Sequence, residues 1–239
     1  MDTTEPFAAN CPAPTTDRPL LGLTVLVVED SRYTCEAMRL LCLRSGARIR
    51  RADCIRSARR HLQVYRPSVV VIDMGLPDGN GADLIEELTQ GEDDRSIVLA
   101  TSGDDILEAE AMVAGAQGFL AKPITSLAIF QQMILGNLPA DRQPPGLRMI
   151  EDEQVSPDEI AYHDDINYAA ELLDNSPNDQ ALDYIAKFLE GVARSVEDNG
   201  MAEAARALAS KRACGQATAS ETAQIAGLIQ QRLAVKIAI

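Results

Sequence analysis

The stretch VVVIDMGLPDGNG, residues 69–81, decides the fold of the first half of this chain. Four branched apolar residues lead into one carboxylate, Asp73, and a turn rich in Gly, Pro and Asp follows at once. A continuous apolar run of this length is typical of a strand that is buried on both faces of a parallel sheet. A charge at the end of such a strand is costly unless it is paired. The sequence therefore predicts a partner for Asp73 at this end of the strand.

The segments around this stretch alternate between strand and helix patterns. Short apolar or alternating runs, typical of strands, lie at 23–28, 47–52, 68–72, 96–100 and 117–121. Helical apolar spacing falls between and after them, at 31–43, 55–65, 82–89, 105–114 and 126–135. This alternation predicts an α/β domain over residues 21–136, with a doubly wound five-stranded parallel sheet of the flavodoxin kind.

The rest of the chain divides into three further parts. Residues 1–20 are acidic and Pro-rich and lack the basic and apolar regions of a signal peptide, so we expect a flexible tail. Residues 137–155 combine prolines with an acidic run, which is typical of a linker. Residues 156–239 show four helical patterns and no strand pattern, which predicts a separate all-α domain. Ser156 and Ser176, each followed by Pro, are its predicted helix caps.

Charge and composition narrow the class of partner. The net charge of -14 makes nucleic acid an unlikely partner, because phosphate binding depends on Lys and Arg. The five cysteines are scattered without metal-ligand spacing, so we expect reduced thiols. No apolar run is long enough to cross a bilayer. These features favour a cytoplasmic protein that does not contact a membrane.

Polar residues gather at the carboxyl ends of the predicted strands, where ligands of open parallel sheets bind. They are Glu29 and Asp30, Asp73, Thr101 and Lys122. Crowded carboxylates raise one another's pKa, and a hard cation such as Mg²⁺ would relieve that repulsion while keeping waters for an incoming phosphate. Lys122 suits a phosphoryl oxygen, and Thr101 offers a hydroxyl donor to a second one. The pattern predicts that Asp73 attacks phosphorus and forms an acyl phosphate.

Four motifs in this order carry a family resemblance. ED at 29–30, VVVIDMGLPDGNG at 69–81, LATS at 99–102 and GFLAKP at 118–123 resemble the receiver domain of two-component response regulators. The resemblance covers about residues 21–136, roughly half of the chain. It implies that Asp73 takes its phosphoryl group from a phosphohistidine, on a histidine kinase or a histidine phosphotransfer protein.

The same resemblance assigns a role to each residue of the site. Asp30, Asp73 and the backbone carbonyl of Gly75 would bind Mg²⁺, and Glu29 would help through a water molecule. Thr101 would be the switch hydroxyl, and Phe119 the aromatic residue that rotates with it. The Lys122–Pro123 peptide bond would be cis, which is otherwise rare.

Several residues also allow plainer interpretations. The Asp73 set could be the polar rim of an ordinary α/β domain, and Phe119 could be a core residue. Eight arginines between Arg44 and Arg66 could bind an anion, but a solvated helix face is the favoured interpretation. His163 precedes two aspartates, yet a metal-dependent phosphohydrolase needs more histidines than the two in this chain. We therefore interpret His163 as an ordinary helical residue.

Three hypotheses compete for residues 156–239: an interaction module, a DNA-binding helix-turn-helix near 221–234, and an enzymatic output. From residue 151 onward the chain has 7 Lys and Arg against 16 Asp and Glu, a net charge of -9, which is poor for a DNA reader. For the enzymatic output, residues 156–239 show no nucleophile–base pair, metal cluster or Gly-rich phosphate loop. The favoured hypothesis is a regulator, not an enzyme, that binds a downstream protein or a second copy of itself.

Overall fold

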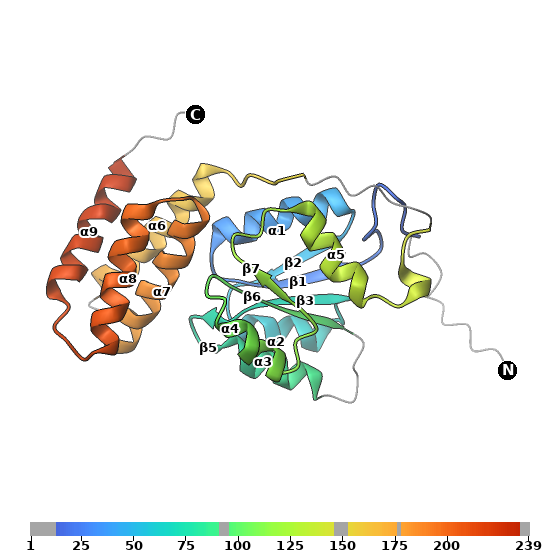
Figure 1. The fold of residues 1–239 in the computed structure, drawn as a ribbon, viewed down its shortest axis with the longest axis horizontal. Coiled ribbons are helices and arrows are strands. Elements are labelled where there is room, and N and C mark those ends of the chain that lie inside the picture. The colour runs from blue at the N-terminus through green and yellow to red at the C-terminus, as the bar shows by residue number, and fades with distance from the viewer. Residues whose placement is uncertain (1–12, 91–95, 146–152, 176–177, 235–239) are drawn as a thin grey trace.

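The protein consists of an α/β sandwich followed by a four-helix bundle, as the computed structural model in Figure 1 shows. The structure describes residues 13–90, 96–145, 153–175 and 178–234. Much of the predicted tail (1–12) and part of the predicted linker (146–152) lie outside the described residues. The predicted fold class, a five-stranded parallel sheet followed by a helical region, is confirmed.

The main sheet has the strand order β2-β1-β3-β6-β7, and all of its pairings are parallel. Its strands are β1 (Thr24–Val28), β2 (Arg48–Ala52), β3 (Val69–Asp73), β6 (Ile97–Ser102) and β7 (Phe119–Ala121). Asp73 of β3 is in register with Thr101 of β6. Because β1, β3, β6 and β7 are neighbours in the sheet, their carboxyl ends form one continuous edge.

Five helices cover the two faces of this sheet. One face carries α1 (Arg32–Ser45) and α5 (Leu127–Asn137), and the other carries α2 (Ile55–Val64), α3 (Gly81–Thr89) and α4 (Leu107–Val113), as Figure 1 shows. Side chains alternate along each strand, so Val69 and Val71 belong to the first core, whereas Val70 and Ile72 belong to the second. Every residue of β3 is buried, which explains its unbroken apolar run.

The turn after Asp73 contains a small antiparallel hairpin, formed by β4 (Gly75–Leu76) and β5 (Gly79–Asn80). Asn80 then caps α3 by accepting a hydrogen bond from the backbone N–H of Ala82. The sequence predicted only a turn here. Gly81, the first residue of α3, sits so close to the strand end that a Cβ atom would lie 2.1 Å from the backbone oxygen of Asp73.

We expect Gly81→Ala to destabilise the protein by about 3 kcal/mol, at the upper end of the cost of overpacking. The added methyl group has no flexible neighbour to displace, since two of the three nearest atoms belong to the backbone of Asp73. Urea unfolding followed by circular dichroism measures the change. Gly136→Ala in α5 is the matched control, because a Cβ there meets nothing within 4 Å. Equal unfolding midpoints for the two variants would contradict this account of Gly81.

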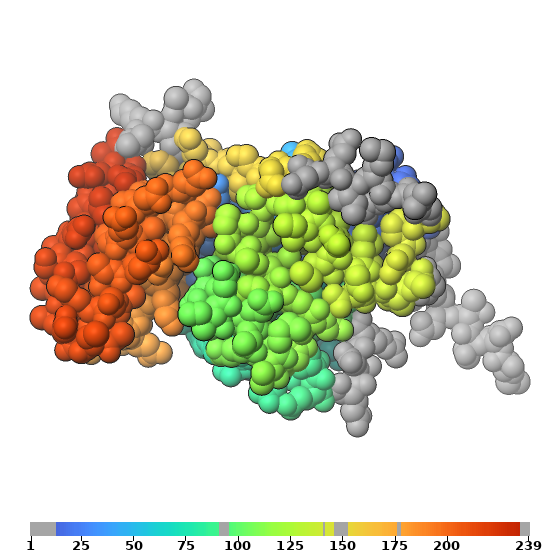
Figure 2. Space-filling view, viewed as in Figure 1, coloured from blue at the N-terminus to red at the C-terminus, as the bar shows by residue number. Residues whose placement is uncertain are grey.

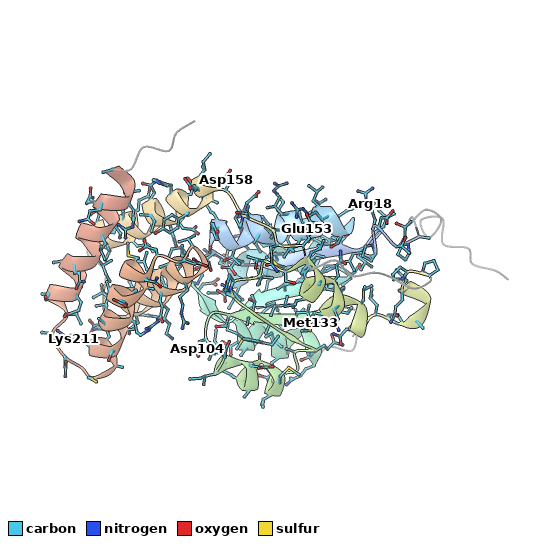
Figure 3. All side chains as sticks on the ribbon, turned by 45° about the horizontal axis from the view of Figure 1, so that its top comes forward. Arg18, Asp104, Met133, Glu153, Asp158 and Lys211 are labelled. Carbon is cyan, nitrogen blue, oxygen red and sulfur yellow. The ribbon has the colours of Figure 1, made fainter. Side chains whose placement is uncertain are left out.

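The packed domain extends beyond the boundaries that the sequence predicted. Leu20, assigned to the flexible tail, is 0% exposed, and its N–H donates a hydrogen bond to the backbone oxygen of Ser45. In the linker, Gln154 forms an isolated antiparallel bridge with Ser126, and Val155 is buried in the core under α1 and α5. The linker is therefore anchored to the domain just before the bundle begins, between Glu153 and Asp158 as labelled in Figure 3. A short 3₁₀ helix, η1 (Ala140–Arg142), precedes it.

The bundle consists of α6 (Glu159–Asp174), α7 (Asp179–Ser195), α8 (Asn199–Ala213) and α9 (Ala219–Ala234). Apolar stripes from all four helices form its core, with Ile166, Leu189, Leu208 and Ile229 as examples. None of the helices in the described ranges is both long enough and apolar enough to span a membrane.

The predicted cap of α6 was wrong, because Asp158 takes the place assigned to Ser156. The Asp158 carboxylate accepts hydrogen bonds from the N–H groups of Ile160 and Ala161 at the start of the helix. Both hydrogen bonds go to the same oxygen, Oδ1, and its negative charge is favourable at the positive end of a helix. The cap of α7 is Asn178, and Ser176 lies outside the described residues.

Asp198 joins three helices of the bundle. Its carboxylate accepts hydrogen bonds from the Tyr162 hydroxyl of α6 and from two nitrogens of Arg232 in α9, at 2.6 and 2.9 Å. It also caps α8 by accepting a hydrogen bond from the N–H of Met201. The hydrogen bonds from Arg232 lower the pKa of Asp198 to about 2. The positive charge of Arg232 is thus paired with the Asp198 carboxylate inside the bundle.

Candidate functional site

Four neighbouring strand ends bring the predicted polar residues together. Glu29 and Asp30 follow β1, Asp73 ends β3, Thr101 lies near the end of β6, and Lys122 follows β7. Carboxylate oxygens of Glu29, Asp30 and Asp73 all lie within 4.8 Å of one another. The sequence predicted this acidic cluster, and the strand order explains it.

Lys122 lies among these carboxylates. Its Nζ is 2.7 Å from Oε2 of Glu29 and 3.1 Å from Oδ1 of Asp73. The three side chains are only 10%, 1% and 9% exposed, respectively. One ammonium therefore faces three carboxyl groups in a region from which water is largely excluded. Such a set holds more negative charge than Lys122 can balance.

The pKa values of the cluster reflect that excess. Burial raises the pKa of Glu29 well above its usual value, and the negative charge of Asp73 adds to this although Lys122 opposes it. Burial and the charge of Asp73 raise the pKa of Asp30 to about 6. For Lys122 burial alone would lower the pKa, but Asp73 and Glu29 raise it overall. The ammonium is therefore fully charged at neutral pH.

This donor set fits a hard divalent cation. Three carboxylates supply oxygen ligands, which Mg²⁺ and Ca²⁺ prefer. The backbone of Gly75 is close by, since a Cβ at Gly75 would lie 3.9 Å from Oδ2 of Asp73. A cation would also remove the electrostatic cost that raises the pKa of Asp30. The acidic cluster can therefore hold a metal ion.

The two predicted switch residues lie beside this cluster. The Thr101 hydroxyl donates a hydrogen bond of 2.7 Å to the backbone oxygen of Leu120 in β7. Phe119, also in β7, packs partly buried against the core on the face of α2, α3 and α4. The Lys122–Pro123 bond is cis, as predicted. In this structure Thr101 thus ties β6 to β7.

Three residues of the bundle also reach this edge of the sheet, and sequence reasoning missed all of them. The Tyr184 hydroxyl of α7 donates a hydrogen bond to Oδ2 of Asp30. Asp165 of α6 binds the start of α1, and Arg194 of α7 donates to the backbone oxygen of Gly103. Burial and the charge of Asp30 raise the pKa of Tyr184, so its hydroxyl keeps its proton. Each belongs to an amphipathic helix without a recognisable motif.

Other residues considered from the sequence lie outside this cluster. His163 is part of α6, with its ring edge-on to that of Tyr162 at 6.4 Å. In the arginine-rich segment, Arg44 pairs with Glu153 and Arg59 pairs with Glu87. These contacts agree with the plainer interpretations of both features.

Comparisons with known proteins identify the first half of the chain. The family model described as response regulator receiver domain matches residues 25–134. The transcriptional regulatory protein KdpE of the KDP operon of Escherichia coli K12 is 30% identical over 99 residues, which are 41% of this chain and 44% of KdpE. The transcriptional regulatory protein DpiA of the same strain is 31% identical over 105 residues, which are 43% of this chain and 46% of DpiA.

The chain therefore spans less than half the length of these curated relatives. Among solved structures, a putative response regulator from Chloroflexus aurantiacus is 26% identical, with a TM-score of 0.45. That likeness covers 48% of this chain and 98% of the other. Residues 25–134 of this protein are a response regulator receiver domain.

Proposed function

We propose that Asp73 accepts a phosphoryl group from a phosphohistidine on a histidine kinase or a histidine phosphotransfer protein. The protein would then act as a response regulator that controls a protein partner, or its own association, through residues 156–239. The observation that carries the proposal is the convergence of Glu29, Asp30 and Asp73 on one buried lysine, Lys122. This arrangement offers both a nucleophilic carboxylate and the means to offset phosphoryl charge.

In this proposal Asp30, Asp73 and the backbone oxygen of Gly75 would hold Mg²⁺, and Glu29 would contribute through water. When bound, the ion offsets negative charge on the phosphoryl oxygens. One oxygen of Asp73 forms a bond to phosphorus while the phosphorus–nitrogen bond to imidazole breaks and its electron pair stays on the nitrogen. The ammonium of Lys122, 3.1 Å from Asp73, then pairs with a phosphoryl oxygen.

Thr101 would convert this chemistry into a change of shape. Its hydroxyl now donates to Leu120, so donation to a phosphoryl oxygen requires that this hydrogen bond break. The tie between β6 and β7 would then loosen, and Phe119 of β7 would rotate toward the vacated space. The face made by α4, β7 and α5 would change accordingly.

We expect Thr101→Ala to separate phosphorylation from its consequences. Asp73, Lys122 and the metal ligands are untouched, so the variant should form acyl phosphate to an extent within about fivefold of wild type, since one neutral hydrogen bond contributes roughly 1 kcal/mol. The response to the phosphoryl group should be lost. Hydrogen exchange of β7, with and without beryllofluoride, measures it, and an unchanged response in the variant would disprove the role of Thr101.

The proposed output is tested by the absolute mass of the protein in solution, measured by light scattering. The sample is compared with and without Mg²⁺ and beryllofluoride, which mimics the phosphoryl group. A shift in mass that the Asp73→Asn variant lacks would show control of self-association. An unchanged mass in both proteins would exclude self-association and leave a separate protein as the partner.

A second candidate output is control of DNA binding. The curated relatives are named as transcriptional regulatory proteins, so the expectation that nucleic acid is an unlikely partner is not supported. Against this output, Arg232 of the predicted recognition helix is paired with Asp198 inside the bundle. The test is fluorescence anisotropy with random-sequence duplex DNA at low and high salt. Binding that weakens steeply with salt would favour this second candidate.

A further inference from the structure

The bundle lies directly against the edge of the sheet that carries Asp73. In Figure 1 the ends of β1, β3 and β6 point toward α6 and α7, and Figure 2 shows the two domains in contact along this side. Helix α7 reaches the hairpin strand β4, which follows Asp73, and α6 packs beside α1. The surface of the bundle in this contact, called here the α6–α7 face, comprises Asp164, Asp165, Tyr184, Gly191 and Arg194.

Asp165 makes the most buried polar contact of this interface. One carboxylate oxygen accepts hydrogen bonds from the Ser31 hydroxyl at 2.8 Å and the Tyr33 N–H at 3.1 Å, and the other accepts from the Arg32 N–H at 2.7 Å. Asp165 is only 1% exposed. A carboxylate at the positive end of α1 is a favourable arrangement, and it is supplied here from another domain.

Two further contacts lie on either side of Asp73. The Tyr184 hydroxyl donates a hydrogen bond to Asp30, and its ring stacks on Phe188 at 5.9 Å, which fixes its direction. On the far side, Arg194 donates to the backbone oxygen of Gly103 at 2.7 Å. Gly191 lies so close to this loop that a Cβ at Gly103 would be 3.9 Å from its Cα atom. Helix α7 therefore covers the loops after β1, β3 and β6.

We propose that the α6–α7 face is an intramolecular docking surface that closes the phosphoacceptor edge, and that metal and phosphoryl binding release it. This inference rests on the proposed function of Asp73. A phosphohistidine can reach an oxygen of Asp73 only from the open end of the strands, and the bundle occupies that space. The Asp73 side chain is 9% exposed in the docked state. A protein donor therefore requires the bundle to move.

Release follows from competition for the same atoms. Oδ2 of Asp30 is held by Tyr184 in the docked state, and Asp30 is a proposed metal ligand. The loop that Arg194 holds at Gly103 begins two residues after Thr101, which must turn toward the phosphoryl group. Linkage makes the effect reciprocal, because a docked bundle that weakens ligand binding must itself be weakened by the ligand to the same factor.

The first test compares Asp165→Lys with Asp174→Lys. Both variants make the same charge change on α6, but Asp174 is an exposed residue at the carboxyl end of the helix. The probes are the dissociation constant of beryllofluoride with Mg²⁺, followed by fluorine NMR, and the initial rate of Asp73 labelling by acetyl phosphate. We expect Asp165→Lys to lower the dissociation constant and to raise the labelling rate, each by about tenfold or more. The reason is that the substitution removes three hydrogen bonds to a charged group, and these bonds favour docking.

A second variant covers the case in which Asp165→Lys folds poorly. Tyr184→Phe keeps the stacked ring and removes only the hydroxyl that binds Asp30, so a smaller change in the same direction is expected. Docking itself is monitored by hydrogen exchange of the backbone N–H groups of Arg32 and Tyr33. Both groups donate hydrogen bonds to Asp165 in the docked state. Their exchange should accelerate in Asp165→Lys, and in wild type when beryllofluoride and Mg²⁺ are added.

The outcomes separate this inference from the proposed function. If Asp73 is labelled equally fast in wild type and in a variant whose exchange shows release, the docking surface does not control access and the inference is wrong. Slower exchange at Arg32 and Tyr33 on adding beryllofluoride would also overturn it. If no protein is labelled at Asp73 at all, the proposed function itself fails.

Discussion

Replacing Asp73 with Asn is expected to abolish acyl phosphate formation, the largest effect that we predict. The amide lacks the nucleophilic oxygen, while its shape suits the same buried position at the end of β3. Incubation with acetyl phosphate and Mg²⁺, followed by intact-mass measurement, should show a phosphoryl adduct on wild type only. Removing one of three crowded carboxylates should also relieve repulsion with Glu29 and Asp30, so the variant should remain folded.

Asp104→Asn is the matched control for this experiment. Asp104, labelled in Figure 3, lies at the same end of the domain, in the loop after β6. Its carboxylate accepts a hydrogen bond from the N–H of Ile106. We expect normal phosphorylation of this variant. An adduct on Asp73→Asn equal to that on the control would mean that another residue accepts the phosphoryl group.

Replacing Lys122 with Met is expected to lower the free energy of unfolding by about 3–5 kcal/mol at pH 7.5 without divalent ions. This is the range measured when one partner is removed from a buried ion pair. Met fills a similar volume, so the loss is electrostatic rather than a cavity effect. Three carboxyl groups would remain within 4.8 Å of one another without the ammonium. Urea unfolding followed by circular dichroism measures the change.

The pH dependence of this variant gives the sharper measurement. Asp30 already has a folded-state pKa of about 6, above its ordinary value, so it favours the folded state at acidic pH and this contribution is lost as pH rises through about 6. Without Lys122 the pKa values of Glu29 and Asp30 should rise further. The variant should therefore gain stability relative to wild type as the pH falls from 7.5 to 5.

Lys187→Met is the matched control, because Lys187 is an exposed residue of α7. It should unfold within about 0.5 kcal/mol of wild type, as is usual for surface substitutions. Added Mg²⁺ should restore part of the stability that Lys122→Met loses, since the ion supplies the missing positive charge. A stability difference from wild type that does not change with pH would argue against the electrostatic account.

The sequence was sufficient to predict the receiver domain and its acidic site because the informative residues are local. A continuous apolar run in the sequence indicates a buried parallel strand, and β3 ends at Asp73, directly after that run. The polar residues that follow β1, β6 and β7 could be found in the same way. Only the strand order, which places these ends side by side, is not visible in the sequence, and the structure supplies it.

The contacts between the domains could not be predicted in this way. Tyr184 meets Asp30 and Asp165 meets Ser31 across 154 and 134 residues of sequence. Nothing in an amphipathic helix distinguishes a tyrosine that binds a carboxylate of another domain from one that packs in its own core. The requirement for glycine at position 81 could not be predicted either. It arises because the backbone of Asp73, across a hairpin, leaves no room for a side chain.

The anchored linker determines how strongly the bundle competes with other proteins for the phosphoacceptor edge. Val155 is buried in the receiver core and the first turn of α6 begins at Glu159, so only three residues separate the two domains. A tether this short gives the bundle an effective concentration on the order of millimolar or higher at its docking site. A partner protein in solution at micromolar concentration would compete poorly with it. Occupancy of Asp73, rather than abundance of a competitor, would then determine when the edge opens.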